Sequence, residues 1–191
     1  MQISKILLAA LAASMVTGSA PVRSQERPAT AQTPDAASKD MPAWMQRGLP
    51  GPGQVRLEVL IGTFKQHKMI YSTLGRDPNA PPLISDDVKT TRQWVAGGRF
   101  IEDISEGTVQ GQQYWRKGWL GYSRMDDRYE WVTIDAVHTT LMSYAGTPGT
   151  GSESPINMLG KFTDQGVVGE GAVGKEVGMR TVVNIEGAQQ P

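Results

Sequence analysis

Histidines and carboxylates are the side chains of this sequence that could carry catalysis or hold a metal ion. His67 and His138 are its two histidines, and two histidines can join a carboxylate as metal ligands. Glu102, Asp103 and Glu106 crowd into one short segment, and paired carboxylates serve acid–base chemistry when burial separates their pKa values. Ordinary surface histidines and solvated acidic faces are much commoner than such sites. The sequence therefore predicts no metal site, no cofactor and no assigned catalytic residue.

Residues 169–175 match a Gly-x-Gly-x-x-Gly pattern and most of a phosphate-binding loop. Their context does not fit, because Glu176 replaces the Ser or Thr that would hold magnesium and residues 177–185 alternate like a strand instead of opening a helix. We interpret the segment as a glycine-rich hairpin. The chain also has no cysteine and no Gly-x-Ser-x-Gly elbow, so the usual nucleophile arrangements are absent.

Aromatic side chains give the strongest functional signal, because aromatic residues that line a lumen are what a small apolar ligand meets. The alternative is that they are core residues and plugs at the ends of the fold. Arg99 follows a glycine pair and would either bind a ligand carboxylate or pair with Asp103 or Glu102; Arg92 and Arg116 are further candidates for the lining. The predicted ligand-binding residues are Trp94, Arg99, Tyr114, Trp115, Trp119, Tyr122, Trp131 and Asp135.

Short β-type segments follow one another through residues 62–145 without a convincing helix, and they must position these side chains. In residues 87–95 the alternation puts Val88, Thr90, Arg92 and Trp94 on one face. Residues 97–98 are a glycine pair that gives the positive φ angles of a hairpin turn. Further strands are expected at 99–109, 113–123, 129–136, 138–145, 155–163 and 176–185, about eight in all.

Neither face of these strands is purely apolar, which favours an antiparallel up-and-down barrel with a partly polar lumen over an open sheet with one dry side. Residues 54–61 fit either a strand or one helical turn before the first strand. The proline-rich residues 77–82 predict a loop. Residues 41–45 carry three large apolar side chains, which are expected to dock on the domain.

The N-terminus has the charged, apolar and small-residue order of a secretory signal peptide, with Lys5 before the apolar residues 6–16. We expect cleavage after Ser24, a disordered Pro- and Ala-rich tether with a docking segment over 25–53, and one β-barrel domain over 54–191. The expected location is the periplasm or the exterior of the cell. The apolar run is too short to span a bilayer, so the mature chain should have no integral membrane segment.

The charges of the whole chain balance. With 19 basic and 19 acidic residues, no long-range field would attract nucleic acid.

The order of short motifs along the chain resembles that of an uncharacterised family of exported bacterial proteins, number 1579 among the domains of unknown function. The motifs that carry the resemblance are Trp44-Met45, Pro50-Gly51, Gly62-Thr63-Phe64, Pro78 to Pro82, Gly97 to Phe100, Leu120 to Tyr122, and Tyr129 with Ile134-Asp135. The resemblance implies an all-β, calycin-like (lipocalin-like) barrel. Phe64 and Thr133 stand where the family usually has Trp.

The family pattern continues with a further pair of strands after the one that ends near Ile185. The resemblance therefore implies an incompletely closed barrel with strand edges that favour pairing with another chain. Our first functional hypothesis is a non-enzymatic exported protein that binds a small amphipathic or hydrophobic molecule in the lumen. The alternatives are an interaction or assembly module, including a homo-oligomer through the strand edges, and an enzyme with carboxylate or histidine–metal chemistry.

Overall fold

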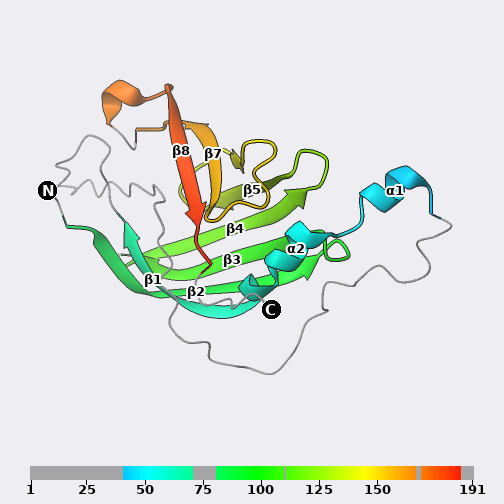
Figure 1. Ribbon diagram of the computed structural model, residues 1–191. Helices are drawn as coiled ribbons and strands as arrows, with labels where there is room; N and C mark the ends of the chain where they lie inside the picture. The colour runs from blue at the N-terminus through cyan, green and yellow to red at the C-terminus, as the bar shows by residue number, and fades with distance from the viewer. Residues whose placement is uncertain (1–40, 71–80, 110, 167–168, 186–191) are drawn as a thin grey trace, which may run out of the picture.

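The computed structural model describes residues 41–70, 81–109, 111–166 and 169–185. Its main element is one sheet of eight strands in which each strand pairs antiparallel with the next along the chain. The predicted all-β, up-and-down topology is thus confirmed (Figure 1). The strands are β1 (Gly62–Ile70), β2 (Leu83–Val95), β3 (Phe100–Val109), β4 (Gln112–Ser123), β5 (Arg128–Asp135), β6 (Met142–Ala145), β7 (Ile156–Thr163) and β8 (Glu176–Val183).

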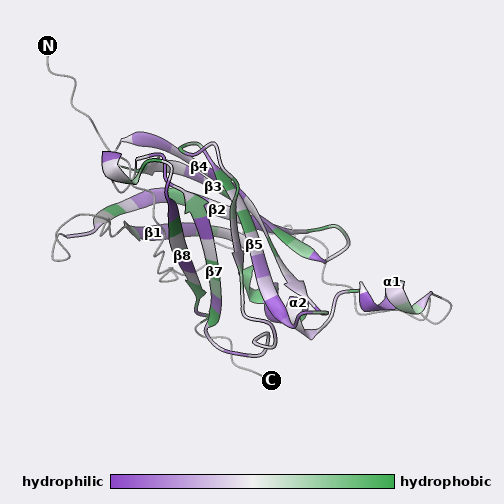
Figure 2. Ribbon diagram, turned by 90° about the horizontal axis from the view of Figure 1, so that it is seen from above, coloured by the Kyte–Doolittle hydropathy of each residue, from purple (hydrophilic) through white to green (hydrophobic). Residues whose placement is uncertain are grey.

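The sheet curls on itself without closing. β7 and β8 stand across the direction of β1 to β4 in both views (Figures 1 and 2), and within the described residues no ladder joins β8 to β1. The fold is therefore an incompletely closed barrel, as the family resemblance implied. β1 and β8 each keep one edge without a neighbouring strand among these residues.

The alternation along each strand separates an inner face from an outer face. Val88, Thr90, Arg92 and Trp94 share the inner face, as predicted, and their partners on β3 include Ser105, Asp103 and Ile101. Hydrophilic and hydrophobic stretches are interleaved along single strands (Figure 2), which agrees with the mixed character of both faces. The larger buried apolar cluster is Leu57, Ile101, Leu120, Tyr129, Met142, Tyr144, Ile156, Met158, Phe162 and Met179, and a smaller one is Val88, Val109 and Tyr114.

One end of the sheet is covered by the short helix α2 (Pro52–Arg56) and the 3-10 turn η2 (Glu58–Leu60). This resolves the open choice for residues 54–61 in favour of a helix. Pro52 is pre-set for the first helical turn, and the Gln54 side chain accepts a hydrogen bond from Gly51 N at 2.8 Å. Leu57, at the end of α2, is fully buried, and Tyr129 donates a hydrogen bond to the Gly53 carbonyl at 3.1 Å. The covered end is thus the apolar end.

The structure differs from the predicted strands most clearly at residues 138–145. β6 begins only at Met142, because the Asp135 carboxylate accepts hydrogen bonds from Val137 N and His138 N, both at 2.8 Å, and turns the chain there. The predicted loop at 77–82 lies mostly outside the described residues. The glycine pair does form the β2–β3 turn, with φ of 65° at Gly97 and 79° at Gly98.

The segment that carries Trp44 does not bury its apolar side chains. It forms α1 (Ala43–Arg47), which has no buried residue, and Trp44 is 69% exposed. Its contacts with the domain are polar: Arg124 donates to the Gln46 carbonyl at 3.3 Å. α1 projects from the body of the protein (Figure 1), so the expected docking of its large side chains is not seen.

Candidate ligand site on the inner face

The strand register brings polar side chains together in two adjacent rows of the inner face. Thr90 lies opposite Ser105 and Ser105 opposite Arg116, and in the next row Arg92 lies opposite Asp103. Each row continues onto β5, at Asp135 and Thr133 respectively. Lys68 and Tyr114 lie outside these two rows, opposite Ser85 and Gly107, and contact each other. We call the polar side chains of the two rows, together with Lys68 and Tyr114, the inner polar belt: Lys68, Thr90, Arg92, Asp103, Ser105, Tyr114, Arg116, Thr133 and Asp135.

Asp103 is the centre of the belt. Its carboxylate accepts a hydrogen bond from Arg92 Nε at 2.6 Å and another from Arg116 Nη2 at 3.2 Å. The Asp103 side chain is only 3% exposed, so these two guanidinium groups supply the opposite charge that a buried carboxylate needs. Beside it, the hydroxyls of Thr90 and Ser105 bond to each other at 2.7 Å.

Lys68 reaches the belt from β1 and is buried. Its ammonium lies 3.7 Å from the centre of the Tyr114 ring, a cation–π contact. Lys68 forms no ion pair with any described carboxylate. Burial, with the positive charge of Arg116, lowers the pKa of Lys68 to about 7, although Asp103 and Asp135 act in the opposite direction. Lys68 thus changes charge near neutral pH.

Two buried hydrogen-bond donors of the belt region have no partner among the described residues. They are Arg116 Nε and Trp131 Nε1. The Arg116 guanidinium lies over the Trp131 ring, 4.8 Å from its centre. The residue directly opposite Trp131 is Leu120, and the indole can reach over the neighbouring pair because that position of β4 is Gly118, where a Cβ atom would come within 2.7 Å of Trp131 Nε1. The two donors therefore belong to one stacked pair on the inner face.

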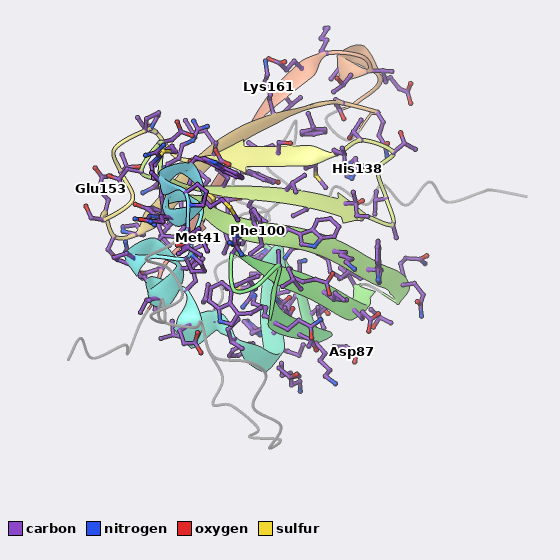
Figure 3. All side chains as sticks on the ribbon, turned by 90° about the vertical axis from the view of Figure 1, so that its right-hand side faces the viewer. Met41, Asp87, Phe100, His138, Glu153 and Lys161 are labelled. Carbon is purple, nitrogen blue, oxygen red and sulfur yellow. The ribbon has the colours of Figure 1, made fainter. Side chains whose placement is uncertain are left out.

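Asp135 and His138 form a pair at the end of the belt, and both side chains are buried. His138 Nδ1 lies 3.2 Å from both oxygens of Asp135. Burial of Asp135 acts against its charged form, but hydrogen bonds from His138 and from the backbone N–H groups of Val137 and His138 outweigh it, so the pKa of Asp135 is lowered. Figure 3 places His138 at the end of the sheet away from Met41 and Glu153. The described residues contain no cluster of three or more histidines and acidic residues able to hold a metal ion.

A family model described as "Protein of unknown function (DUF1579)" matches residues 53–190. The chain belongs to this family. The match confirms the family that the sequence motifs indicated, and it covers the whole sheet and all of α2 after Pro52. No curated protein and no solved structure gave a significant match. The helices in the described part of this DUF1579 protein are all too short or too polar to cross a bilayer.

Five of the eight predicted ligand-binding residues of the DUF1579 protein lie on the inner face. Trp94, Tyr114, Trp131 and Asp135 lie along or beside the polar belt, in register with it. Tyr122 lies at the apolar end, where its ring contacts Tyr129 with centroids 5.2 Å apart. Its hydroxyl donates a hydrogen bond to Asp127, and this bond raises the pKa of Tyr122 to about 12.

The other three predicted residues lie elsewhere. Trp115 and Trp119 alternate with Arg116 and Leu120 along β4 and so lie on the outer face. Arg99 lies beside the β2–β3 turn, where it donates hydrogen bonds to the carbonyls of Gly48 and Ala96 at 2.8 and 3.0 Å. Arg99 thus binds backbone carbonyl groups. It does not pair with Asp103 or Glu102, which was one of the two roles expected from the sequence.

Trp119 instead lines a shallow groove on the outer face, with a volume of about 670 Å³. The groove crosses β3 to β7, and its outward side chains include Phe100, Val132, Leu159 and Lys161. Two of these lining residues, Phe100 and Lys161, can be found by their labels in Figure 3. Trp131 and Tyr144 of the inner-face rows also contribute atoms to the lining of this groove, whereas no residue of the polar belt does.

Sequence reasoning missed Lys68, Thr90, Ser105 and Thr133. The signal for Lys68 was present, because period-two alternation along β1 puts it on the same face as Phe64 and Gln66. What hid the belt was a bulge in the β1–β2 pairing: Gln66 lies opposite Val88, but Lys68 lies opposite Ser85. The partner strand carries one extra residue there, so no simple alternation in β2 predicts which residue meets Lys68.

Proposed function

We propose that this DUF1579 protein is a non-enzymatic binding protein that acts outside the cytoplasm and takes up a small amphipathic molecule on the inner face of its sheet. The observation that carries the proposal is the stacked pair Arg116 and Trp131. It places two buried donors without described partners directly beside the apolar core. A ligand with one polar end and one apolar end matches both surroundings.

The apolar half of the proposed site follows the polar rows toward α2. Trp94, Ile101, Leu120 and Trp131 lie in register across four strands, and the row continues to Tyr144, whose ring centroid is 5.6 Å from that of Trp131. Trp94 is held in place by a hydrogen bond from its Nε1 to Glu58 Oε2 at 2.7 Å. Because this apolar row lies next to the polar rows of the belt, the inner face has a polar part and an apolar part.

Titration with octan-1-ol, a neutral amphiphile, tests the proposal through tryptophan emission. We expect a saturable change in emission, because Trp94 and Trp131 lie on the inner face. Trp131→Phe should remove much of that change, whereas Trp115→Phe, on the outer face of the neighbouring strand, should leave it. No saturable change in the wild-type protein would contradict the proposal, and so would a change that depends on Trp115 instead of Trp131.

A second candidate function is an interaction or assembly module, which was an alternative expected from the sequence. Two observations favour it: α1 exposes Trp44 and Met45, and the outer groove exposes Phe100 and Leu159. Large exposed apolar side chains that gather in a patch are typical of interaction surfaces. The oligomeric state, treated in the Discussion, separates this candidate from the first.

A further inference from the structure

The geometry of the inner polar belt points to an anionic head group, a carboxylate, on the ligand, bound by Arg116 and Lys68. This inference rests on the proposed function, because it names the chemical class of the molecule that the same site binds. Three features of the described residues carry it: the balance of buried charge, the kind of polar atom left without a partner, and the order of polar and apolar rows.

When Lys68 is protonated, the buried charges of the belt do not cancel. Lys68, Arg92 and Arg116 are cationic side chains, and both arginines share the single carboxylate of Asp103. The second carboxylate, Asp135, is engaged by His138 and two backbone N–H groups and forms no ion pair with an arginine or lysine of the belt. A buried cation without an opposite charge is destabilising. A bound carboxylate would supply the missing negative charge.

The unpaired polar atoms of the stacked pair can only donate. Arg116 Nε and Trp131 Nε1 carry hydrogens and no acceptor lone pair, and the Lys68 ammonium likewise only donates. Their partner must therefore be an acceptor, and an ionised carboxylate accepts stronger hydrogen bonds than an alcohol or a carbonyl does. The remaining unpaired buried atoms, His138 Nε2 and the hydroxyls of Thr140 and Thr181, can each accept as well as donate. These three atoms are therefore compatible with a carboxylate as the partner of Arg116 and Trp131.

The order of the rows sets the direction of the ligand. The polar row that contains Arg116 is followed, toward α2, by the row of Asp103 and then by the apolar row of Ile101 and Leu120. With the head group at Arg116, the apolar chain of the ligand lies along Trp131 toward the covered end of the sheet. A monocarboxylate with an unbranched alkyl chain has this arrangement of groups.

Three probes with the same alkyl chain but different head groups test the inference by calorimetry on the full chain. They are octanoate, octan-1-ol and octyltrimethylammonium. We expect octanoate to bind about tenfold or more tighter than octan-1-ol, which corresponds to one charge-assisted hydrogen bond. Octyltrimethylammonium should bind most weakly. Arg116→Met and Lys68→Met should each lower octanoate affinity about tenfold and leave octan-1-ol affinity within about twofold.

The variants complement each other. Arg116→Met removes one partner of Asp103 and risks misfolding, whereas Lys68→Met breaks no ion pair among the described residues. Lys65→Met is the matched control, because Lys65 is an exposed lysine of the same strand. Equal binding of octanoate and octan-1-ol, or an octanoate preference that survives Lys68→Met, would overturn the carboxylate inference and leave the proposed function standing. Failure of all three probes to bind would overturn both.

Discussion

At the scale of single residues, Lys68 shows how a side chain is shaped by its surroundings. A lysine is ordinarily exposed, but this one is buried on the inner face and rests on the Tyr114 ring. Arg116 faces it from β4 and Asp103 from β3. Burial, together with the positive charge of Arg116, gives Lys68 a lower pKa than a solvated lysine has, although Asp103 acts in the opposite direction. The folded state therefore carries a cost that a permanently neutral side chain would not.

Lys68→Met should stabilise the protein, and most strongly at low pH. The folded chain releases the Lys68 proton near pH 7, whereas the unfolded chain keeps it up to the ordinary pKa of 10.5. Wild-type stability should therefore rise between these pH values, because the unfolded state binds more protons there. The gain from Lys68→Met should be greatest below pH 7, on the order of a few kcal/mol, and should shrink toward pH 10.

Urea unfolding of wild type, Lys68→Met and Lys65→Met at several pH values measures this difference. The two lysines share a strand, but Lys65 is exposed, so its variant should follow the wild-type curve within about 0.5 kcal/mol. A Lys68→Met gain that is constant from pH 6 to 10 would show that the effect comes from packing and not from charge.

At the scale of elements, the sequence pattern predicted the presence of the strands well, but it predicted the residues at which they begin and end less well. Period-two alternation identified the inner face of β2, and glycines identified the β2–β3 turn, because both signals are local. The late start of β6 was missed because it depends on the Asp135 side chain, which bonds to the two following backbone N–H groups. The belt was found only in part because the β1–β2 bulge and the pairing of Asp103 with arginines of two strands are tertiary features.

Gly53→Ala should destabilise the protein by about 1–3 kcal/mol through overpacking. A Cβ atom at Gly53 would lie 2.3 Å from atoms of the Tyr122 ring, so either α2 or that ring must move. The same movement would disturb the hydrogen bond from Tyr129 to the Gly53 carbonyl. Thermal unfolding followed by circular dichroism measures the loss.

Gly178→Ala is the control for this substitution. Gly178 lies on β8 with no atom within 4 Å of its Cβ position, so its variant should unfold within about 0.5 kcal/mol of wild type. Equal destabilisation by both variants would indicate a general effect of losing glycine, and the close contact between α2 and Tyr122 would not be its cause.

At the scale of the whole molecule, the N-terminal residues and the open sheet bear on where the protein acts and whether it acts alone. Residues 1–24 have the sequence order of a signal peptide. We expect the protein purified from the periplasm or the medium to begin at Gln25, which N-terminal sequencing would show. A chain that keeps Met1 and stays in the cytoplasm would contradict export.

The open edges of the sheet raise the question of self-association. β1 and β8 each leave backbone groups without a neighbouring strand among the described residues, but both edges carry exposed charged side chains, including Lys65 on β1 and Glu176 and Arg180 on β8. Charged side chains along an edge oppose strand addition by another chain. The charged side chains at both open edges therefore favour a monomer.

We expect light scattering on the full mature chain to give a monomer mass over a wide concentration range, in agreement with a binding protein whose site lies within one sheet. A stable dimer would favour the assembly candidate, and Trp44→Ser would then identify the surface. If the exposed side chain of Trp44 makes the contact, Trp44→Ser should restore the monomer without altering octan-1-ol binding. If the edges pair instead, the dimer should persist in Trp44→Ser, because neither β1 nor β8 contains that residue.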